Sequence, residues 1–145
     1  MQEGALELEM RARRTGPYSP TVLGGLSAAR DLLAKPTTAV IAYNDLLAIG
    51  VLRGLARDGV AVPAQMSVVG FDNSFGSDFC TPSLTTVAAP LHALGATAVQ
   101  QLVSQIKGAP PHTAAPGVLP AQLVVRESTA PPPRRSDPAP PQPGS

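Results

Sequence analysis

The chain has 145 residues, one cysteine and a net charge of +1, which corresponds to a single domain without an internal disulfide. The small charge, with only two tyrosines and three phenylalanines, argues against a basic nucleic-acid surface or a stacking platform for single strands. No apolar run is long enough for a membrane span or a secretory signal, so we expect a cytoplasmic protein.

The two ends of the chain differ in composition from its middle. Residues 1–17 form an atypical N-terminal segment, in which residues 6–10 could be either a helical turn or a short strand. Residues 130–145 contain seven prolines and no large apolar side chain, so they cannot bury enough surface to offset chain entropy. We therefore predict a folded domain over residues 18–129 and a disordered, proline-rich tail after it.

The first predicted helix starts at Ser19 and Pro20, with the serine as N-cap and the proline in the first helical position. Apolar residues then recur at helical spacing at Val22, Leu26, Ala29 and Leu33. Gly24 and Gly25 should weaken this helix by roughly 1 kcal/mol each relative to alanine. Their presence suggests close packing against a neighbouring element. The proline at position 36 should end the helix.

Two short apolar segments rich in β-branched residues follow. The first, residues 38–43, leads into a helix that should end near Gly59. The second, residues 66–71, leads into a segment over residues 75–83 that we expect to be irregular. Apolar runs of this kind are typical of strands that are buried on both faces.

The last part of the chain predicts two strands and a helix. Residues 84–87 (LTTV) and 122–126 (QLVVR) read as short strands. Between them Pro90 opens a helix that Lys107 and Gly108 should close. Its apolar face comprises Leu91, Leu94, Ala98, Leu102 and Ile106. The alternation of strands and helices predicts an α/β fold with a parallel sheet flanked by helices.

Polar pairs follow the first two predicted strands: Asn44-Asp45 and Asp72-Asn73. Ligands of open parallel sheets bind outside the carboxyl ends of the strands, so these side chains should share one edge. Carboxylates and amides at that edge suit a polyol, a sugar or a purine edge. Helix capping or fold support is the favoured reading for Asp45 and ligand contact for Asp72, while Asn44 stays open between the two.

An enzyme is the alternative, because Asp45 and Asp72 could act as acid and base. However, the sequence has no nucleophile motif, no metal-ligand spacing and no phosphate-cradling loop, so we expect neither catalysis nor a cofactor or metal. His92 and His112 lie where solvation is expected. Cys80 should be a packed thiol.

Three segments together resemble the lactose/galactose-repressor family: residues 36–63 (PTTAVIAYNDLLAIGVLRGLARDGVAVP), 66–73 (MSVVGFDN) and 81–102 (TPSLTTVAAPLHALGATAVQQL). The ending at residues 119–129 (LPAQLVVREST) also fits. The resemblance implies part of a type I periplasmic-binding-protein-like sensor, normally two α/β lobes around a ligand crevice. In that family a helix-turn-helix headpiece binds the operator, and small ligands, often sugars or nucleobases, change its DNA affinity.

The resemblance also implies roles for six residues. Those that match ligand contacts are Asn44, Asp72 and Leu91. Those that match the dimer interface are Ile49, Phe79 and Cys80. A leucine at position 91, which is often aromatic in the family, weakens the case for stacking on a sugar face. The sequence contains no headpiece, hinge helix or first lobe, so we expect no operator binding by this chain alone.

The sequence therefore predicts the ligand-sensing and dimerisation part of a transcriptional regulator, with a sugar as its expected effector. Two alternatives remain open at this stage. One is a transport-type sugar-binding protein of the same fold, and the other is an enzyme that uses Asp45 and Asp72. A helix-turn-helix or a signal peptide encoded upstream of Met1 would separate the regulator from the transport protein.

Overall fold

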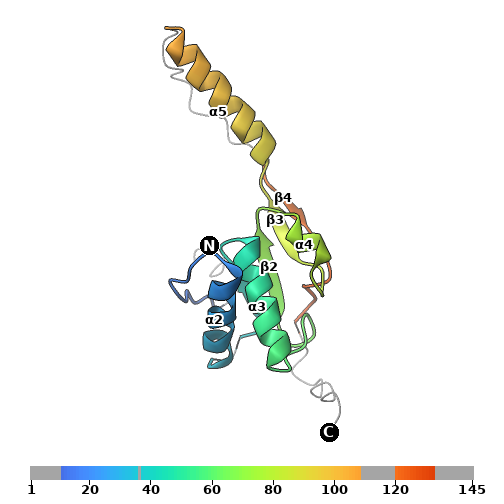
Figure 1. Ribbon diagram of the computed structural model, residues 1–145. Coiled ribbons are helices and arrows are strands. Elements are labelled where there is room, and N and C mark those ends of the chain that lie inside the picture. Colours follow the sequence, from blue (N-terminus) through green and yellow to red (C-terminus); the bar gives the residue numbers. More distant parts are fainter. Residues whose placement is uncertain (1–10, 36, 109–119, 133–145) are drawn as a thin grey trace.

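The computed structural model describes residues 11–35, 37–108 and 120–132. Its elements in chain order are α2 (Val22–Leu33), β1 (Ala39–Ile41), α3 (Asp45–Arg57), β2 (Ser67–Phe71), α4 (Gly76–Phe79), β3 (Thr85–Ala88), α5 (Leu91–Ile106) and β4 (Gln122–Val124). This arrangement confirms the predicted α/β class (Figure 1). The expectations for residues 6–10, for His112 and for most of the proline-rich tail lie outside the described residues.

The four strands form one sheet in the order β1-β2-β3-β4. The pairs β1–β2 and β2–β3 are parallel, as predicted. Strand β4 pairs with β3 in the antiparallel sense, which the sequence analysis did not foresee. The chain leaves from the carboxyl end of β3 into α5 and returns at the same end, where Ala88 pairs with Gln122. A strand that returns in this way must run in the opposite direction.

Helix α2 begins later than expected, with Thr21 instead of Ser19 as its N-cap. The Thr21 hydroxyl accepts a hydrogen bond of 3.1 Å from the backbone N–H of Gly24. The expected start at Ser19 is wrong because the Ser19 carbonyl accepts from the Thr21 N–H at 2.7 Å, which forms a separate turn ahead of the helix.

Helices α2 and α3 lie side by side on one face of the sheet (Figure 1). They meet backbone to backbone at Gly25 and Gly50. A Cβ on Gly25 would overlap the backbone of Leu47 and Gly50, and a Cβ on Gly50 would overlap Val22 and Gly25. The close packing that the paired glycines suggested is therefore confirmed at Gly25.

The hydrophobic core lies around α3 and strand β2. Its buried members are Ala28, Ala42, Leu47, Ala48, Ile49, Val51, Leu52, Leu55, Met66, Val68 and Leu84. The chain stays attached to this body through Ala130, whose backbone N–H and carbonyl both bond to the Ser67 hydroxyl. The first residue of the expected tail is therefore held to β2.

The segment after β2 is more ordered than expected, because it contains the four-residue helix α4. Both the backbone N–H and the hydroxyl of Ser77 donate to the Ser74 carbonyl, at 2.9 and 2.7 Å. The Ser77 carbonyl in turn accepts from the Leu84 N–H at 2.7 Å. These local bonds stabilise a helical turn that no apolar periodicity marks in the sequence.

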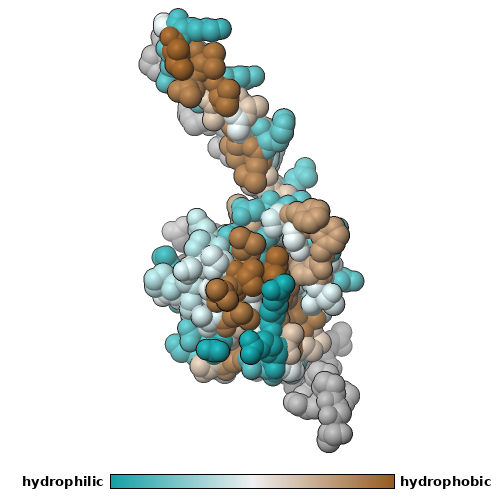
Figure 2. Space-filling view, viewed as in Figure 1, coloured by the Kyte–Doolittle hydropathy of each residue, from teal (hydrophilic) through white to brown (hydrophobic). Residues whose placement is uncertain are grey.

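Helix α5 projects away from the rest of the fold, and none of its residues is buried (Figure 1). Its apolar side chains form a hydrophobic surface along the helix (Figure 2). Gly108 follows the C-cap Lys107 with φ +80°, and Gly59 follows the C-cap of α3 with φ +73°, as the glycine positions predicted. Among the described residues, no helix combines the length and apolar character needed to cross a membrane.

Candidate ligand-binding site

Asn44 and Asp72 lie at corresponding positions beyond two neighbouring parallel strands. Ile41 of β1 pairs with Val69 of β2, and each site residue lies three positions beyond its paired residue. The Ala42 N–H continues the ladder by donating to the Val69 carbonyl at 2.8 Å. The structure therefore brings Asn44 and Asp72 to the same edge of the sheet, where parallel sheets bind ligands.

The Asn44 side chain joins the starts of two helices. Its Oδ1 accepts from the Leu47 N–H at 2.9 Å and caps α3, and its Nδ2 donates to the Pro20 carbonyl at 3.3 Å ahead of α2. An amide has two further hydrogen-bonding positions after these bonds. Asn44 is therefore a helix cap that still has capacity for a ligand.

Asp45 supports the fold, which is the reading that the sequence favoured. Its side chain is 1% exposed. Oδ1 accepts from the Thr86 hydroxyl and Oδ2 from the Ser74 N–H, each at 2.6 Å. A Cβ on Gly70 would overlap this carboxylate, so the glycine in β2 makes room for it. Asp45 is therefore committed to internal hydrogen bonds.

Asp72 has an unusual backbone conformation with φ +109°, and Asn73 follows with φ +53°. Only a few per cent of residues other than glycine adopt positive φ. The Asp72 N–H donates to the Val87 carbonyl at 2.9 Å, and the Asn73 N–H donates to the Thr86 hydroxyl at 3.3 Å. Strand β3 thus holds the backbone of this loop in place.

The carboxyl of Asp72 is partly buried and stands near the charge of Asp45. Burial, and to a lesser degree the negative charge of Asp45, raises the pKa of Asp72 above its ordinary value. Both causes disfavour the charged form. A ligand that donates hydrogen bonds to the carboxylate would relieve this unfavourable environment.

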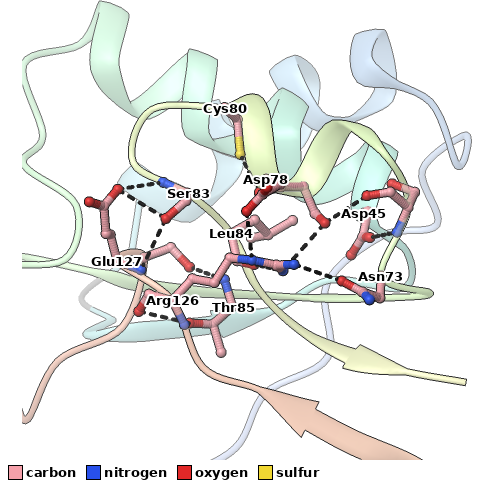
Figure 3. A network of polar contacts seen from close by, with 12 residues as sticks. Asp45, Asn73, Asp78, Cys80, Ser83, Leu84, Thr85, Arg126 and Glu127 are labelled. Atoms are coloured by element: carbon pink, nitrogen blue, oxygen red, sulfur yellow. Dashed lines mark hydrogen bonds and ion pairs between the residues drawn. The ribbon is translucent and has the colours of Figure 1, made fainter.

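Arg126, which the sequence analysis placed only as the end of a strand, occupies the centre of a polar network beside the site (Figure 3). Its Nη2 donates to Asn73 Oδ1 at 2.9 Å, and its Nη1 donates to the Leu84 carbonyl at 2.8 Å. Its Nε lies 3.3 Å from the Asp78 carboxylate on α4. Nothing in the local sequence pattern points to these contacts.

Leu91 is the first residue of α5 and is 56% exposed. The helix leaves from the same edge at which Asp72 lies, since Phe71 pairs with Val87 just before β3 ends. The structure thus places Leu91 beyond the shared edge, on the helix that projects away from the body.

The three residues that match the family's dimer interface have different environments. Ile49 is 8% exposed and belongs to the hydrophobic core. Phe79 on α4 is 70% exposed. Cys80 packs partly against the core and its thiol donates to the Ser77 carbonyl at 3.3 Å, while burial raises the pKa of that thiol. Of the three, Phe79 is the one that is clearly accessible.

Phe75, which no sequence pattern singled out, packs against Phe79 with its ring tilted. Their ring centroids lie 4.6 Å apart, and Phe75 is 85% exposed. Figure 2 shows a hydrophobic patch over α4, where these rings lie. We call Phe75 and Phe79 the α4 aromatic pair.

The periplasmic-binding-protein-like domain family matches residues 2–129, a span that begins ahead of the Tyr18 boundary inferred from the sequence. The chain belongs to this family. Its relatives include the transcriptional regulator MalR of Streptomyces coelicolor, 43% identical over 111 residues, and the repressor CytR of Escherichia coli, 36% identical over 112 residues. These matches cover 76% and 75% of this chain but 32% of each relative.

Solved structures of the same family have closely similar folds. The regulator CelR in complex with cellobiose has a TM-score of 0.77 and 34% identity, over 88% of this chain and 40% of that one. A LacI family regulator from Enterococcus faecium with bound ribose has a TM-score of 0.71 and 35% identity, over 79% and 42%. The lac repressor dimer bound to operator has a TM-score of 0.79 and 26% identity, over 88% and 45%. The predicted relationship to LacI-type repressors is therefore confirmed.

Proposed function

We propose that this periplasmic-binding-protein-like chain is the effector-sensing part of a transcriptional regulator, that it binds a sugar beside Asp72, and that it self-associates through the α4 aromatic pair. The observation that carries the sensing role is the position of Asp72, an aspartate with φ +109° at the carboxyl edge of a parallel sheet, beside Asn44. A transcriptional regulator binds DNA in the cytoplasm of a bacterial cell, so we propose that this protein acts there.

The strained backbone of Asp72 supports a role for its side chain. Conformations of this kind cost of order 1–3 kcal/mol and cluster at functional sites. Glycine would adopt the same φ without the penalty. An aspartate at this position is best explained if its carboxylate does something that glycine cannot do.

The chemistry of the edge suits a sugar. A carboxylate can accept hydrogen bonds from two adjacent hydroxyls, and the free positions of the Asn44 amide can donate and accept. Two similar regulators are described with cellobiose and with ribose bound, which makes these sugars the first candidates for this chain. Leu91 contributes apolar surface at most, because a leucine offers no aromatic face for stacking.

The geometry favours binding over catalysis. An acid–base pair would need both carboxylates at the reaction centre. Asp45 is buried and both of its oxygens already accept hydrogen bonds from Thr86 and Ser74. Asp45 is therefore not accessible as the second carboxylate of an acid–base pair with Asp72.

The α4 aromatic pair supports self-association with a second copy of the chain. Two exposed phenylalanines whose rings contact each other are an unfavourable surface for a monomer and a suitable anchor for an interface. The lac repressor, similar in fold, is described as a dimer on its operator. DNA recognition would belong to a separate headpiece, since this sequence has a net charge of only +1.

Thermal shift and isothermal titration with ribose, cellobiose and other mono- and disaccharides, plus adenosine as a nucleoside comparison, test the proposal. We expect one sugar to stabilise the chain, and Asp72→Ala to weaken its binding tenfold to a hundredfold, because a hydrogen bond to a charged group contributes about 1.5–3 kcal/mol. Asn44→Ser, which keeps a helix cap, should weaken binding more mildly. Asp58→Ala, at the far end of α3, is the control.

Two results would overturn the proposal. One is the absence of any thermal shift up to about 10 mM of every sugar, a concentration at which even weak specific binding is visible. The other is equal sugar affinity in Asp72→Ala and in the Asp58→Ala control.

A further inference from the structure

The guanidinium of Arg126 contacts three successive segments between residues 73 and 84, all of them more than 40 residues ahead of it in the sequence. Its Nη2 bonds to Asn73 in the loop after β2, its Nη1 to the Leu84 carbonyl ahead of β3, and its Nε pairs with Asp78 on α4 (Figure 3). The Arg126 side chain is 17% exposed. Arg126 therefore links the loop that carries Asp72 to the helix that carries the α4 aromatic pair.

The backbone of Arg126 is hydrogen-bonded to β3. Its backbone N–H donates to the Thr85 hydroxyl at 2.8 Å, and that hydroxyl also lies 3.2 Å from the Arg126 carbonyl as a donor. The next residue, Glu127, accepts two bonds of 3.0 Å from the backbone N–H and hydroxyl of Ser83. These bonds hold the backbone at Arg126 and Glu127 in place. A displacement of the Asp72 loop or of α4 would therefore move the guanidinium of Arg126 and not its backbone.

The loop from Asp72 to Ser74 has four polar anchors to other parts of the fold. The Val87 carbonyl holds the Asp72 backbone, and Thr86 holds the Asn73 backbone. Asp45 holds the Ser74 backbone, and Arg126 holds the Asn73 side chain. Of these anchoring residues, Arg126 also forms an ion pair with Asp78 on α4. A planar guanidinium can maintain such a three-way geometry, whereas a lysine ammonium acts as a single point charge.

We propose that Arg126 is a positioning residue that couples the Asp72 loop to α4, so that sugar binding and self-association change each other's affinity. This inference rests on the proposed function. A sugar bound to the Asp72 carboxylate would shift the neighbouring Asn73. The Arg126 guanidinium, which is bonded to Asn73 Oδ1, would move with it and would displace its ion-pair partner Asp78. Phe79 is the next residue after Asp78, so the α4 aromatic pair moves with it. Coupling of this kind is reciprocal by thermodynamic linkage.

The test measures the dimer dissociation constant by sedimentation velocity, with and without saturating cellobiose or ribose, whichever binds more tightly. In the unaltered chain we expect the sugar to change the dimer dissociation constant by about tenfold. In Arg126→Lys the chain should still bind sugar and still dimerise, but the change should fall below about twofold. A residue that served only to stabilise the fold would leave this ratio unaltered. Arg57→Lys, an exposed arginine in the last turn of α3, is the matched control.

An unaltered ratio in Arg126→Lys overturns the proposal, as does a sugar that binds the unaltered chain without changing its self-association. If neither sugar binds, or if the chain does not dimerise, the proposed function fails, and hydrogen exchange still decides the coupling. Arg126→Gln should then raise amide exchange from Asn73 through Phe79 by about tenfold, with α3 unchanged. Exchange that rises in the loop but not in α4 overturns the link between them, and so does no rise in either.

Discussion

The Thr86 hydroxyl donates a hydrogen bond of 2.6 Å to the Asp45 carboxylate and so joins β3 to the first residue of α3. The other carboxylate oxygen accepts from the Ser74 N–H at 2.6 Å. Asp45 and Thr86 are both buried, so water cannot replace either partner. One side chain thus fixes a helix, a strand and the loop that carries the candidate ligand-binding residue.

Asp45→Ala should lower the free energy of unfolding by about 2–4 kcal/mol, because it leaves the Thr86 hydroxyl and the Ser74 N–H without their acceptor. Asp45→Asn keeps one acceptor oxygen and should lose about half as much. Urea denaturation measures both, with the exposed Asp58→Ala as a control expected within about 0.5 kcal/mol of the unaltered chain. Equal stability of the two alanine variants would show that these bonds contribute nothing.

Asp72→Gly should separate stability from binding. Glycine relieves the backbone strain at φ +109°, so we expect a gain of about 1 kcal/mol in the free energy of unfolding, together with sugar binding weakened as in the alanine variant. Asp72→Ala should weaken sugar binding without that gain in stability, since alanine is strained at the same φ. A glycine variant that binds sugar as tightly as the unaltered chain would contradict the role given to the carboxylate.

Sugar binding should weaken on mild acidification. The pKa of Asp72 is raised by burial and by the charge of Asp45, so its carboxylate takes up a proton at a higher pH than an exposed aspartate does. We expect affinity to fall as the pH is lowered through the raised pKa of Asp72, at a higher pH than an exposed aspartate would require, with titration calorimetry as the measurement. In Asp72→Asn any remaining affinity should not change over the same acidification.

The same raised pKa fixes the sign of the stability effect. Since the folded state binds the Asp72 proton more tightly than the unfolded state, protonated Asp72 contributes stability that is complete below the unfolded pKa. This contribution is lost as the pH rises through the folded pKa. Asp72→Asn should therefore be more stable, relative to the unaltered chain, at pH 7 than at pH 3. A difference that does not change with pH would contradict the shift.

Phe79→Ser should weaken self-association by at least about thirtyfold, because truncating an aromatic anchor typically costs about 2 kcal/mol or more. Phe75→Ser should act in the same direction, and Leu23→Ser, an exposed apolar residue on α2, is the control. Ile49→Glu is unsuitable as a test, since it places a charge in the core and should unfold the chain. Sedimentation velocity that shows dimers of undiminished affinity in both phenylalanine variants would exclude this surface.

Two glycines in helices should respond to alanine in opposite directions. Gly50→Ala forces a methyl group into the backbone of α2 and should destabilise the chain by at least about 2 kcal/mol. Gly95→Ala on α5 meets open space and should stabilise by about 0.5–1 kcal/mol through helix propensity. Thermal denaturation of the two variants checks both the contact and its absence.

The local sequence pattern was sufficient to predict most helices and strands. It was not sufficient where the same pattern fits both a residue in the chain's own core and a residue in an interface. Short-range sequence signals alone predict the helix after Asn44, since Asn44 can cap its start and Gly59 can follow its end. The apolar residues just ahead of Asn44 predict the preceding strand. Ile49 is different, because an apolar residue at helical spacing has the same pattern whether it faces its own core or a partner. In the structure Gly76 of α4 lies over the Ile49 side chain, which belongs to the hydrophobic core.

The polar network was beyond sequence reasoning for a different reason. Arg126 meets Asn73 across 53 residues, and Asp45 meets Thr86 across 41. The periodicity of a sequence does not show which strands and loops become neighbours in space. The antiparallel pairing of β4 with β3 was not predicted either. Phe75 and Phe79 are one helical turn apart, so their pairing could have been found if α4 had been recognised as a helix.

Helix α5 turns small rotations at the sheet into large displacements at its far end. Its 16 residues extend about 24 Å from the edge of the sheet, so a rotation of about 10° at Leu91 would move Ile106 by about 4 Å. The strand that leads into this helix carries Thr86, whose hydroxyl is bonded to Asp45 and accepts from the Asn73 backbone. Helix α5 thus begins close to the candidate binding loop, so a tilt too slight to break any bond there would displace the far end of the helix by several ångströms.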